Sequence, residues 1–350
     1  MNAKYSRRTG RPRLDASERA RLLAEIAKLG APATTELDAQ SAALRAALSE
    51  SVEPPADEPE AAQDAVTPTD REATAAAPIE QPKAPAEPAE PAAKPAAQPA
   101  PPQRAPSPKA LNAEWAGLPM LDVSPALLER NLVITAKRTD PAHGAFDVLR
   151  TRLVQALAEK GWRRVAITSP TAGCGKSFTA INLAVTLSRY DQCRTILMDM
   201  DLRKPGLARY LGVRNAGSTG DYLRGLTDAP DYFTRLQGER LNIGTNLALG
   251  LNGQVEDFAA ELFQQPSTGE VLAEMEDMFA PEVVLFDLPP ALAQDDVIAF
   301  RPHFDCLLMV VGGGITTAEE VREAQRRIGE DKPLLGVVLN KAEVEGDYAY

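Results

Sequence analysis

A glycine-containing segment at residues 169–177, SPTAGCGKS, has the residue types that bind phosphate. It lies between an apolar run that predicts a strand and a stretch with the apolar spacing of a helix. Gly173 and Gly175 allow backbone amides to approach phosphate oxygens closely, and the following helix adds the positive end of its dipole. Lys176 would neutralise phosphate charge, and the hydroxyl of Ser177 would bind Mg²⁺. This segment therefore predicts a nucleotide site.

Two other apolar runs end in aspartate. Asp199 and Asp201 follow the run at residues 196–198, and alternation along an extended chain places both carboxylates on the same side. Asp287 follows the run at residues 283–286 and precedes two prolines that end the strand. Carboxylates at strand ends that face a phosphate-binding loop can bind Mg²⁺ and orient a nucleophile. Each aspartate singly could be a helix cap, whereas the ordered set predicts a nucleotide and metal site.

The elements that must position these residues form an alternating pattern of apolar runs and helical stretches. Strands are expected at residues 165–167, 195–198, 283–286, 306–311 and 334–339, with a lead-in strand at 132–135. The helix before them is indicated by the spacing of Phe146, Leu149, Leu153 and Leu157. The runs are apolar throughout, as in strands buried on both faces, and helices are expected between residues 198 and 283. We therefore predict an α/β fold with a doubly wound, mostly parallel sheet flanked by helices, and ligand at the carboxyl ends of its strands.

Composition divides the chain into four parts. Residues 51–110 contain 15 of the 29 prolines, and no aromatic residue occurs between Tyr5 and Trp115. Such a stretch cannot bury enough apolar surface to offset its chain entropy, so we expect a disordered Pro/Ala/Glu-rich linker. The expected parts are a basic N-terminal segment with a short helix at residues 1–50, the linker at 51–110, one α/β domain at 111–342 and a tail at 343–350. Two interpretations of the N-terminal helix stay open. It either docks on a partner protein or on an anionic membrane surface, or it is a solvated helix that binds neither.

The charge balance and the cysteines exclude several classes of protein. The formal net charge is −11, and an acidic folded part is not expected to bind nucleic acid through a broad basic face. The three cysteines lack metal-ligand spacing and cannot form a full set of disulfides, which favours a reducing cytoplasm. No apolar run reaches the roughly 18–20 residues of a membrane span, and the N-terminus lacks the apolar core of a signal peptide. We therefore expect a cytoplasmic protein.

The three motifs, in this order, resemble those of the bacterial tyrosine kinases (BY-kinases), which control capsule and exopolysaccharide export. The resemblance extends from about Asn131 to Asn340 and includes the Arg-Lys-Pro sequence at residues 203–205. The phosphate loop has Pro170 at the first glycine position of the ordinary P-loop pattern, so the resemblance is to the deviant Walker class. Thr171 stands where the partitioning and septum-site ATPases of that class usually carry a signature lysine, and this favours the kinase branch.

The resemblance implies an ATP-dependent protein-tyrosine kinase that uses Mg²⁺. In such an enzyme Lys176 would act on the phosphates, Asp199 would activate the acceptor tyrosine hydroxyl, and Asn340 would contact the adenine. The implied metal ligands are Ser177, Asp201 and Asp287. The implied nucleotide contacts are Gly173, Cys174, Gly175, Lys176, Ser177, Phe178 and Asn340.

Two features of the resembled family are reduced in this sequence. The Glu-x-x-Arg-x-x-Arg motif that usually joins kinase subunits into a ring keeps only its last arginine, Arg150, so self-association is expected to use another contact if it occurs. The tail holds two tyrosines, Tyr348 and Tyr350, as candidate phosphorylation sites. Because no membrane-spanning chain-length domain is present in the sequence, the expected activator is a separate membrane chain-length-determinant or polysaccharide co-polymerase protein. That partner would recruit the kinase to the inner face of the cell membrane.

Two other functions stay open from the residues alone. A partitioning-type ATPase, which hydrolyses ATP to switch between assembly states, would need the same phosphate loop and aspartates. A nucleotide-sensing adaptor without kinase activity would also keep them. The adaptor is favoured by the reduced subunit-contact motif and by the small number of tyrosines in the tail.

Overall fold

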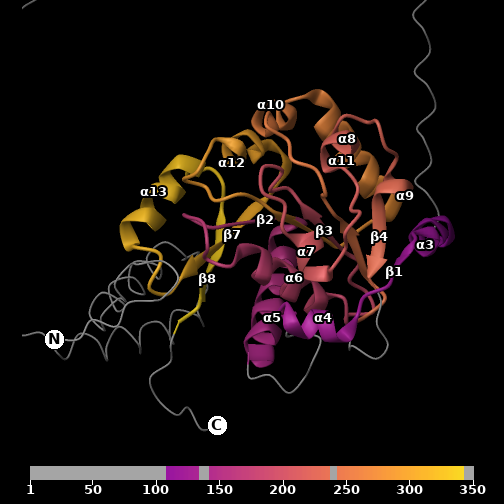
Figure 1. Ribbon diagram of the computed structural model, residues 1–350, viewed down its shortest axis with the longest axis horizontal. Helices are drawn as coiled ribbons and strands as arrows, with labels where there is room; N and C mark the ends of the chain where they lie inside the picture. The colour runs from indigo at the N-terminus through magenta and orange to yellow at the C-terminus, as the bar shows by residue number, and fades with distance from the viewer. Residues whose placement is uncertain (1–107, 134–141, 237–242, 343–350) are drawn as a thin grey trace, which may run out of the picture. The chain divides into compact units, whose positions relative to one another are not determined.

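The computed structural model of the chain describes residues 108–133, 142–236 and 243–342 (Figure 1). The expected N-terminal helix, most of the linker, the tail with Tyr348 and Tyr350, and residues 134–135 of the expected lead-in strand lie outside these ranges. The described part of that strand prediction is wrong. Leu132 lies in a turn with a φ of +61°, and the amide of Val133 donates to the carbonyl of Leu128.

Within the described ranges, eight strands form one sheet in the order β1-β4-β5-β3-β6-β2-β7-β8. The strands are β1 (Met120–Leu121), β2 (Arg164–Thr168), β3 (Thr195–Asp199), β4 (Phe233–Leu236), β5 (Leu247–Gly250), β6 (Val283–Asp287), β7 (Cys306–Gly312) and β8 (Leu334–Asn340). All neighbouring pairs are parallel except β4 and β5. The doubly wound, mostly parallel α/β fold is confirmed, and β2, β3, β6, β7 and β8 are the five strands predicted from continuous apolar runs.

Strands β4 and β5 correct the expectation that the chain between residues 198 and 283 is helical throughout. Each has four residues, and the two middle residues of β4 are only half-buried. A segment this short shows no periodicity that separates a strand from part of a buried helix. The pairing of β4 with β5, which depends on the rest of the sheet, decides the conformation here.

Alternate residues of the central strands contribute to two separate hydrophobic clusters. In β6, Val284 and Phe286 belong to one cluster, and Val283 and Leu285 belong to the other. Because successive side chains of a strand point to opposite faces, each face of the sheet has its own buried layer. This arrangement explains why the strand sequences are apolar throughout and not alternating.

Helices cover both faces of the sheet (Figure 1). They are α3 (Pro108–Gly117), α4 (Pro125–Arg130), α5 (Ala142–Lys160), α6 (Lys176–Leu187), α7 (Leu207–Leu211), α8 (Thr219–Leu223), α9 (Ala229–Tyr232), α10 (Ala259–Phe263), α11 (Pro266–Phe279), α12 (Asp296–Ala299), the 3₁₀ helix η3 (Arg301–His303) and α13 (Ala318–Ile328). The predicted helix before the first core strand is confirmed as α5, with Phe146, Leu153 and Leu157 buried. Among the described residues, no helix combines the length and apolar character needed to cross a membrane.

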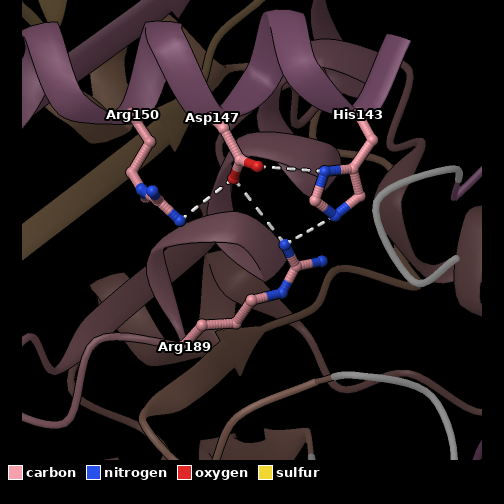
Figure 2. A pocket seen from close by; sticks show the side chains of 4 residues that line it. All are labelled: His143, Asp147, Arg150 and Arg189. Carbon is pink, nitrogen blue, oxygen red and sulfur yellow. Dashed lines mark hydrogen bonds and ion pairs between the residues drawn. The ribbon is translucent and has the colours of Figure 1, made fainter. Parts of the chain in front are cut away.

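Helix α5 also carries a polar cluster that includes one residue beyond α6 (Figure 2). The Asp147 carboxylate lies 3.0 Å from Nδ1 of His143 and 3.0 Å from Nη1 of Arg150. Nη1 of Arg189 is 3.8 Å from the same carboxylate. The guanidinium carbon of Arg150 lies 4.6 Å from the ring centroid of Tyr190. The arginine retained from the expected subunit-contact motif is therefore engaged within its own chain.

Candidate nucleotide site

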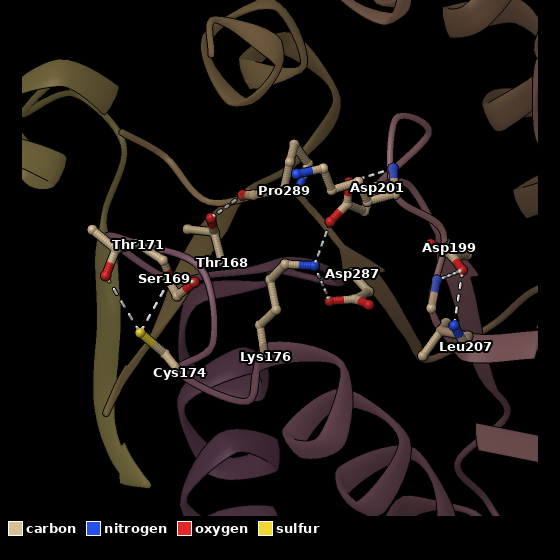
Figure 3. Close-up of polar contacts among 12 residues, drawn as sticks. Thr168, Ser169, Thr171, Cys174, Lys176, Asp199, Asp201, Leu207, Asp287 and Pro289 are labelled. Carbon is tan, nitrogen blue, oxygen red and sulfur yellow. Dashed lines mark hydrogen bonds and ion pairs between the residues drawn. The ribbon is translucent and has the colours of Figure 1, made fainter. Parts of the chain in front are cut away.

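The three predicted motifs meet at one edge of the sheet (Figure 3). Strand β6 lies between β2 and β3 and is parallel to both. Asp199 and Asp287 are the last residues of β3 and β6, and their Cα atoms are paired in register. The phosphate loop continues from the carboxyl end of β2 into α6. The predicted position of the site, at the carboxyl ends of the parallel strands, is thus the place where these residues gather.

The phosphate loop depends on its two glycines and on the loop after β6. Gly173 and Gly175 have φ values of +87° and +95°, in the left-handed region that side-chain-bearing residues avoid. The amide of Ala291 donates to the carbonyl of Ser169 at 2.8 Å, so the loops after β2 and β6 are directly bonded. The loop is therefore held to the strand that carries Asp287.

Lys176 lies between two of the predicted carboxylates. Its Nζ donates to Oδ2 of Asp201 at 2.7 Å and lies 3.6 Å from Oδ1 of Asp287. Burial alone would lower the pKa of Lys176, but the carboxylates of Asp287 and Asp201 outweigh that effect and raise the pKa above its usual value. The lysine is therefore a fixed positive charge at the start of α6.

Asp199 points to a different partner from Asp201. Its Oδ2 accepts hydrogen bonds from the amides of Gly206 and Leu207, both at 2.9 Å, at the start of α7. Its Oδ1 is buried and has no hydrogen-bond partner among the described residues. Burial, reinforced by Asp287, raises the pKa of Asp199 to about 8. Asp201 lies two residues beyond the end of β3 at Asp199, so the alternation of the strand does not by itself position its carboxylate.

Asp287 fits the role of a metal ligand. Its side chain is fully buried, and neither oxygen has a hydrogen-bond donor within 3.5 Å in suitable geometry among the described residues. Burial raises its pKa, and the charge of Lys176 and the nearby Ser177 hydroxyl act in the opposite direction. With the Asp201 carboxylate and the Ser177 hydroxyl, it supplies the oxygen donors that Mg²⁺ prefers. The described residues contain no group of three or more His, Cys, Asp or Glu side chains that could hold a metal by themselves, so a metal here would also need phosphate or water ligands.

Three other residues that were predicted to contact the nucleotide have side chains that contact other parts of the protein. The Phe178 ring packs edge-on against Phe146 at 5.9 Å between centroids, so it faces α5 and not the loop. The Cys174 thiol is buried 3.1 Å from the carbonyl of Thr171. The Asn340 side chain donates from Nδ2 to the Cys174 carbonyl at 2.9 Å. Asn340 thus contacts the phosphate loop directly.

A further contact joins the loops around the site, and the sequence did not predict it. The guanidinium of Arg203 donates from Nε to Asp296 Oδ2 at 2.9 Å and from Nη2 to Asp296 Oδ1 at 3.1 Å. Its Nη1 also donates to the carbonyl of Asp257, so the loops after β3, β5 and β6 are connected. Asp296 is only 1 % exposed. It is one of two adjacent aspartates in a polar stretch, and no pattern in the sequence distinguishes it as buried.

Substituting Gly175 with alanine should destabilise the loop more than the same change at Gly173. Both positions have positive φ, which costs about 1–2 kcal/mol for a residue with a side chain. At Gly173 the new Cβ would meet nothing within 4 Å, whereas at Gly175 it would lie 2.1 Å from Nδ2 of Asn340. Urea unfolding of the two variants measures the difference. Equal losses of stability would contradict the close approach of Asn340.

Comparison with known families supports a nucleotide site. Residues 165–348 match the family model described as "CobQ/CobB/MinD/ParA nucleotide binding domain". The match covers the phosphate loop, all three aspartates and Asn340.

Curated relatives of the chain are named as kinases. The chain is 28 % identical over 232 residues to tyrosine-protein kinase wzc of Salmonella typhi, an alignment that covers 63 % of this chain and 30 % of that protein. It is 26 % identical over 226 residues to tyrosine-protein kinase YwqD of Bacillus subtilis, covering 64 % of this chain and 92 % of that protein. The chain thus spans about 30 % of the length of the first relative and most of the second.

Solved structures agree on the fold. The kinase domain of Escherichia coli tyrosine kinase ETK superposes with a TM-score of 0.54 at 24 % identity, covering 67 % of this chain and 91 % of that domain. The kinase domain of VpsO gives a TM-score of 0.51 at 24 % identity, covering 61 % and 98 %. At these identities the likeness shows the fold alone.

Proposed function

Because the chain belongs to the CobQ/CobB/MinD/ParA nucleotide-binding domain family, we propose that it binds ATP with Mg²⁺ and transfers the γ-phosphoryl group to a tyrosine hydroxyl of a protein. The observation that carries the proposal is the contact of the phosphate-loop lysine, Lys176, with the carboxylates of Asp201 and Asp287. The names of the relatives that are 26–28 % identical support tyrosine as the acceptor.

Phosphate binding would use the loop and the beginning of α6. The loop amides and the helix N-terminus supply hydrogen-bond donors, and Lys176 supplies charge once it turns from the carboxylates to the phosphates. Ser177, Asp201 and Asp287 would hold Mg²⁺, which supplies charge neutralisation on the phosphate oxygens when bound. The remaining contribution of the chain is positioning, because phosphoryl transfer depends mostly on orientation and electrostatic stabilisation.

Asp199 would accept the proton of the tyrosine hydroxyl. Its Oδ2 is fixed by two amides, which leaves Oδ1 as the oxygen that can take a proton. A pKa of about 8 is close to the pH of the cytoplasm, as suits a general base. This arrangement favours transfer to a hydroxyl acceptor over simple nucleotide binding.

The biological setting that we propose follows from the same likeness to proteins named as bacterial tyrosine kinases. The kinase would regulate the polymerisation and export of exopolysaccharide or capsule, with Tyr348 and Tyr350 as candidate acceptors. A membrane chain-length-determinant protein would activate it and bring it to the inner face of the membrane. Because Arg150 is bonded to Asp147 in its own chain, self-association would use another surface.

A partitioning-type ATPase is the second candidate, favoured by the family description, which includes MinD and ParA. It would use the same phosphate loop, with Asp199 orienting water in place of a tyrosine. The two candidates differ in where the γ-phosphate goes.

To test the proposal, the full chain is incubated with γ-labelled ATP and Mg²⁺, alone and with the cytoplasmic tail of a membrane partner. The variant Lys176→Met is assayed in parallel as the control. Label on tyrosine that is lost in the variant is the expected result. Free phosphate without labelled protein would instead identify an ATPase. ATP binding without turnover would identify a nucleotide-sensing adaptor, and either outcome would overturn the kinase proposal.

A further inference from the structure

Two consecutive residues at the carboxyl end of β8 contact the phosphate loop. Asn340 donates from Nδ2 to the carbonyl of Cys174 at 2.9 Å, and Lys341 donates from Nζ to the carbonyl of Gly173 at 2.6 Å. The two acceptors are successive peptide carbonyls of the loop. Both residues therefore bind the same side of the loop backbone.

The backbone around these donors is fixed in an uncommon conformation. Lys341 has a φ of +59°, in the left-handed region that residues with a side chain rarely adopt outside functional sites. Its amide donates to Oδ1 of Asn340 at 2.9 Å, and the carbonyl of Asn340 accepts from Gly313 at 2.7 Å. A Cβ at Gly313 would lie 2.9 Å from the Lys341 carbonyl, so glycine is required for this approach. The strand end is thus built to present its two side chains to the loop.

The peptide geometry determines what this contact does. In a trans peptide the carbonyl and the following amide point in opposite directions. Holding the carbonyls of Gly173 and Cys174 toward β8 turns the amides of Cys174 and Gly175 away from it. Successive amides oriented in this way can form a concave site for an anion.

We propose that Asn340 and Lys341 are positioning residues that hold the phosphate loop in its anion-binding conformation before nucleotide arrives. The proposal rests on the proposed nucleotide binding and assigns Asn340 a role different from adenine contact. Its amide is oriented by two bonds, from Nδ2 to the Cys174 carbonyl and from the Lys341 amide to Oδ1. These bonds direct Asn340 to the loop backbone, although one N–H and one lone pair stay available.

Inorganic tripolyphosphate separates the two roles, because it has the phosphates of ATP without the base. The full chain with Mg²⁺ is titrated with ATP, tripolyphosphate and adenosine by calorimetry. Asn340→Leu and Lys341→Met should each weaken the binding of ATP and of tripolyphosphate by a similar factor, about 5–20-fold. The affinity for adenosine should stay unchanged. Lys341→Arg keeps a hydrogen-bond donor, so its affinity for ATP and tripolyphosphate should be close to that of the wild-type chain. Lys332→Met is the matched control, because Lys332 also donates to a carbonyl, that of Phe304, near the other end of β8.

Asn340→Asp provides a second variant if Asn340→Leu does not fold. It keeps the oxygen bonded to Lys341 and replaces the donor to Cys174, so the same loss of tripolyphosphate affinity is expected. If these variants bound ATP and adenosine more weakly but tripolyphosphate as tightly as the wild-type chain, the proposal would be overturned in favour of adenine contact. Unchanged affinity for all three ligands would also overturn it. If the wild-type chain bound tripolyphosphate but not ATP, the proposed kinase function would be contradicted, and the variants would still test the role of Asn340 and Lys341. If the wild-type chain bound neither ligand, both the kinase function and this role would be contradicted.

Discussion

Replacing Asp199 with asparagine is expected to abolish tyrosine phosphorylation and, at the same time, to make the folded chain more stable. The carboxamide keeps an oxygen that can accept from the amides of Gly206 and Leu207. It cannot take a proton from an acceptor hydroxyl, and loss of a general base typically costs about 10²–10⁴-fold in rate. Activity and stability should therefore change in opposite directions.

The gain in stability follows from the raised pKa of Asp199. The carboxyl has a pKa of about 8 in the folded chain, against an ordinary value of 3.8. Between these values the folded state binds more protons than the unfolded state, so the free energy of unfolding falls as pH rises through this window. Asparagine is uncharged at every pH and removes the loss, which we place on the order of 2 kcal/mol at pH 8, or about 4–8 °C in melting temperature.

Melting temperatures of wild type and Asp199→Asn between pH 5 and pH 9 test this expectation. The two curves should lie close together at pH 5 and separate as pH rises toward 8, while wild-type kinase activity increases over the same range. Asp201→Asn is the control, since Asp201 is paired with Lys176 and its loss should not stabilise the chain. A variant less stable than wild type at pH 8 would contradict the raised pKa.

The inner strands of the fold could be predicted because both of their faces are buried. The run Val283 to Phe286 is apolar at every position, since its alternate residues enter two different clusters. Strand β4 has two half-buried residues among four and gives no comparable signal. Its conformation depends on pairing with β5 on one side and β1 on the other, and β1 is distant in the sequence.

The site was predictable where chemistry restricts the residue type and local spacing places it. Lys176 and Asp287 are in this class, because a phosphate loop needs its lysine and an apolar strand that ends in aspartate is recognisable. Contacts between distant loops were not predictable. Lys341 and Asp296 acquire their partners only when β8 and α12 are placed beside the loops after β2 and β3.

Replacing Arg203 with alanine is expected to cost about 3–5 kcal/mol in the free energy of unfolding, because it leaves a buried carboxylate without its partner. Asp296 is 1 % exposed, and its described hydrogen bonds come from the Arg203 guanidinium. Asp296→Ala should cost less, since the Arg203 side chain is 24 % exposed and its freed guanidinium can reach water. The double variant should therefore be more stable than Arg203→Ala alone, as expected for two residues that act as a pair.

Urea unfolding of the two single variants and the double variant measures this cycle. Arg326→Ala is the matched control, because Arg326 pairs with Glu323 on the exposed face of α13, where water screens the salt bridge and its loss should change stability little. Additive losses, or a loss below about 1 kcal/mol for Arg203→Ala, would contradict a buried pair. The loop that Arg203 holds also carries Asp201 and leads to the amides that bind Asp199. Because the double variant restores stability without restoring the connection between the loops, it should stay impaired in phosphoryl transfer, which separates the positioning of the site from the stability of the fold.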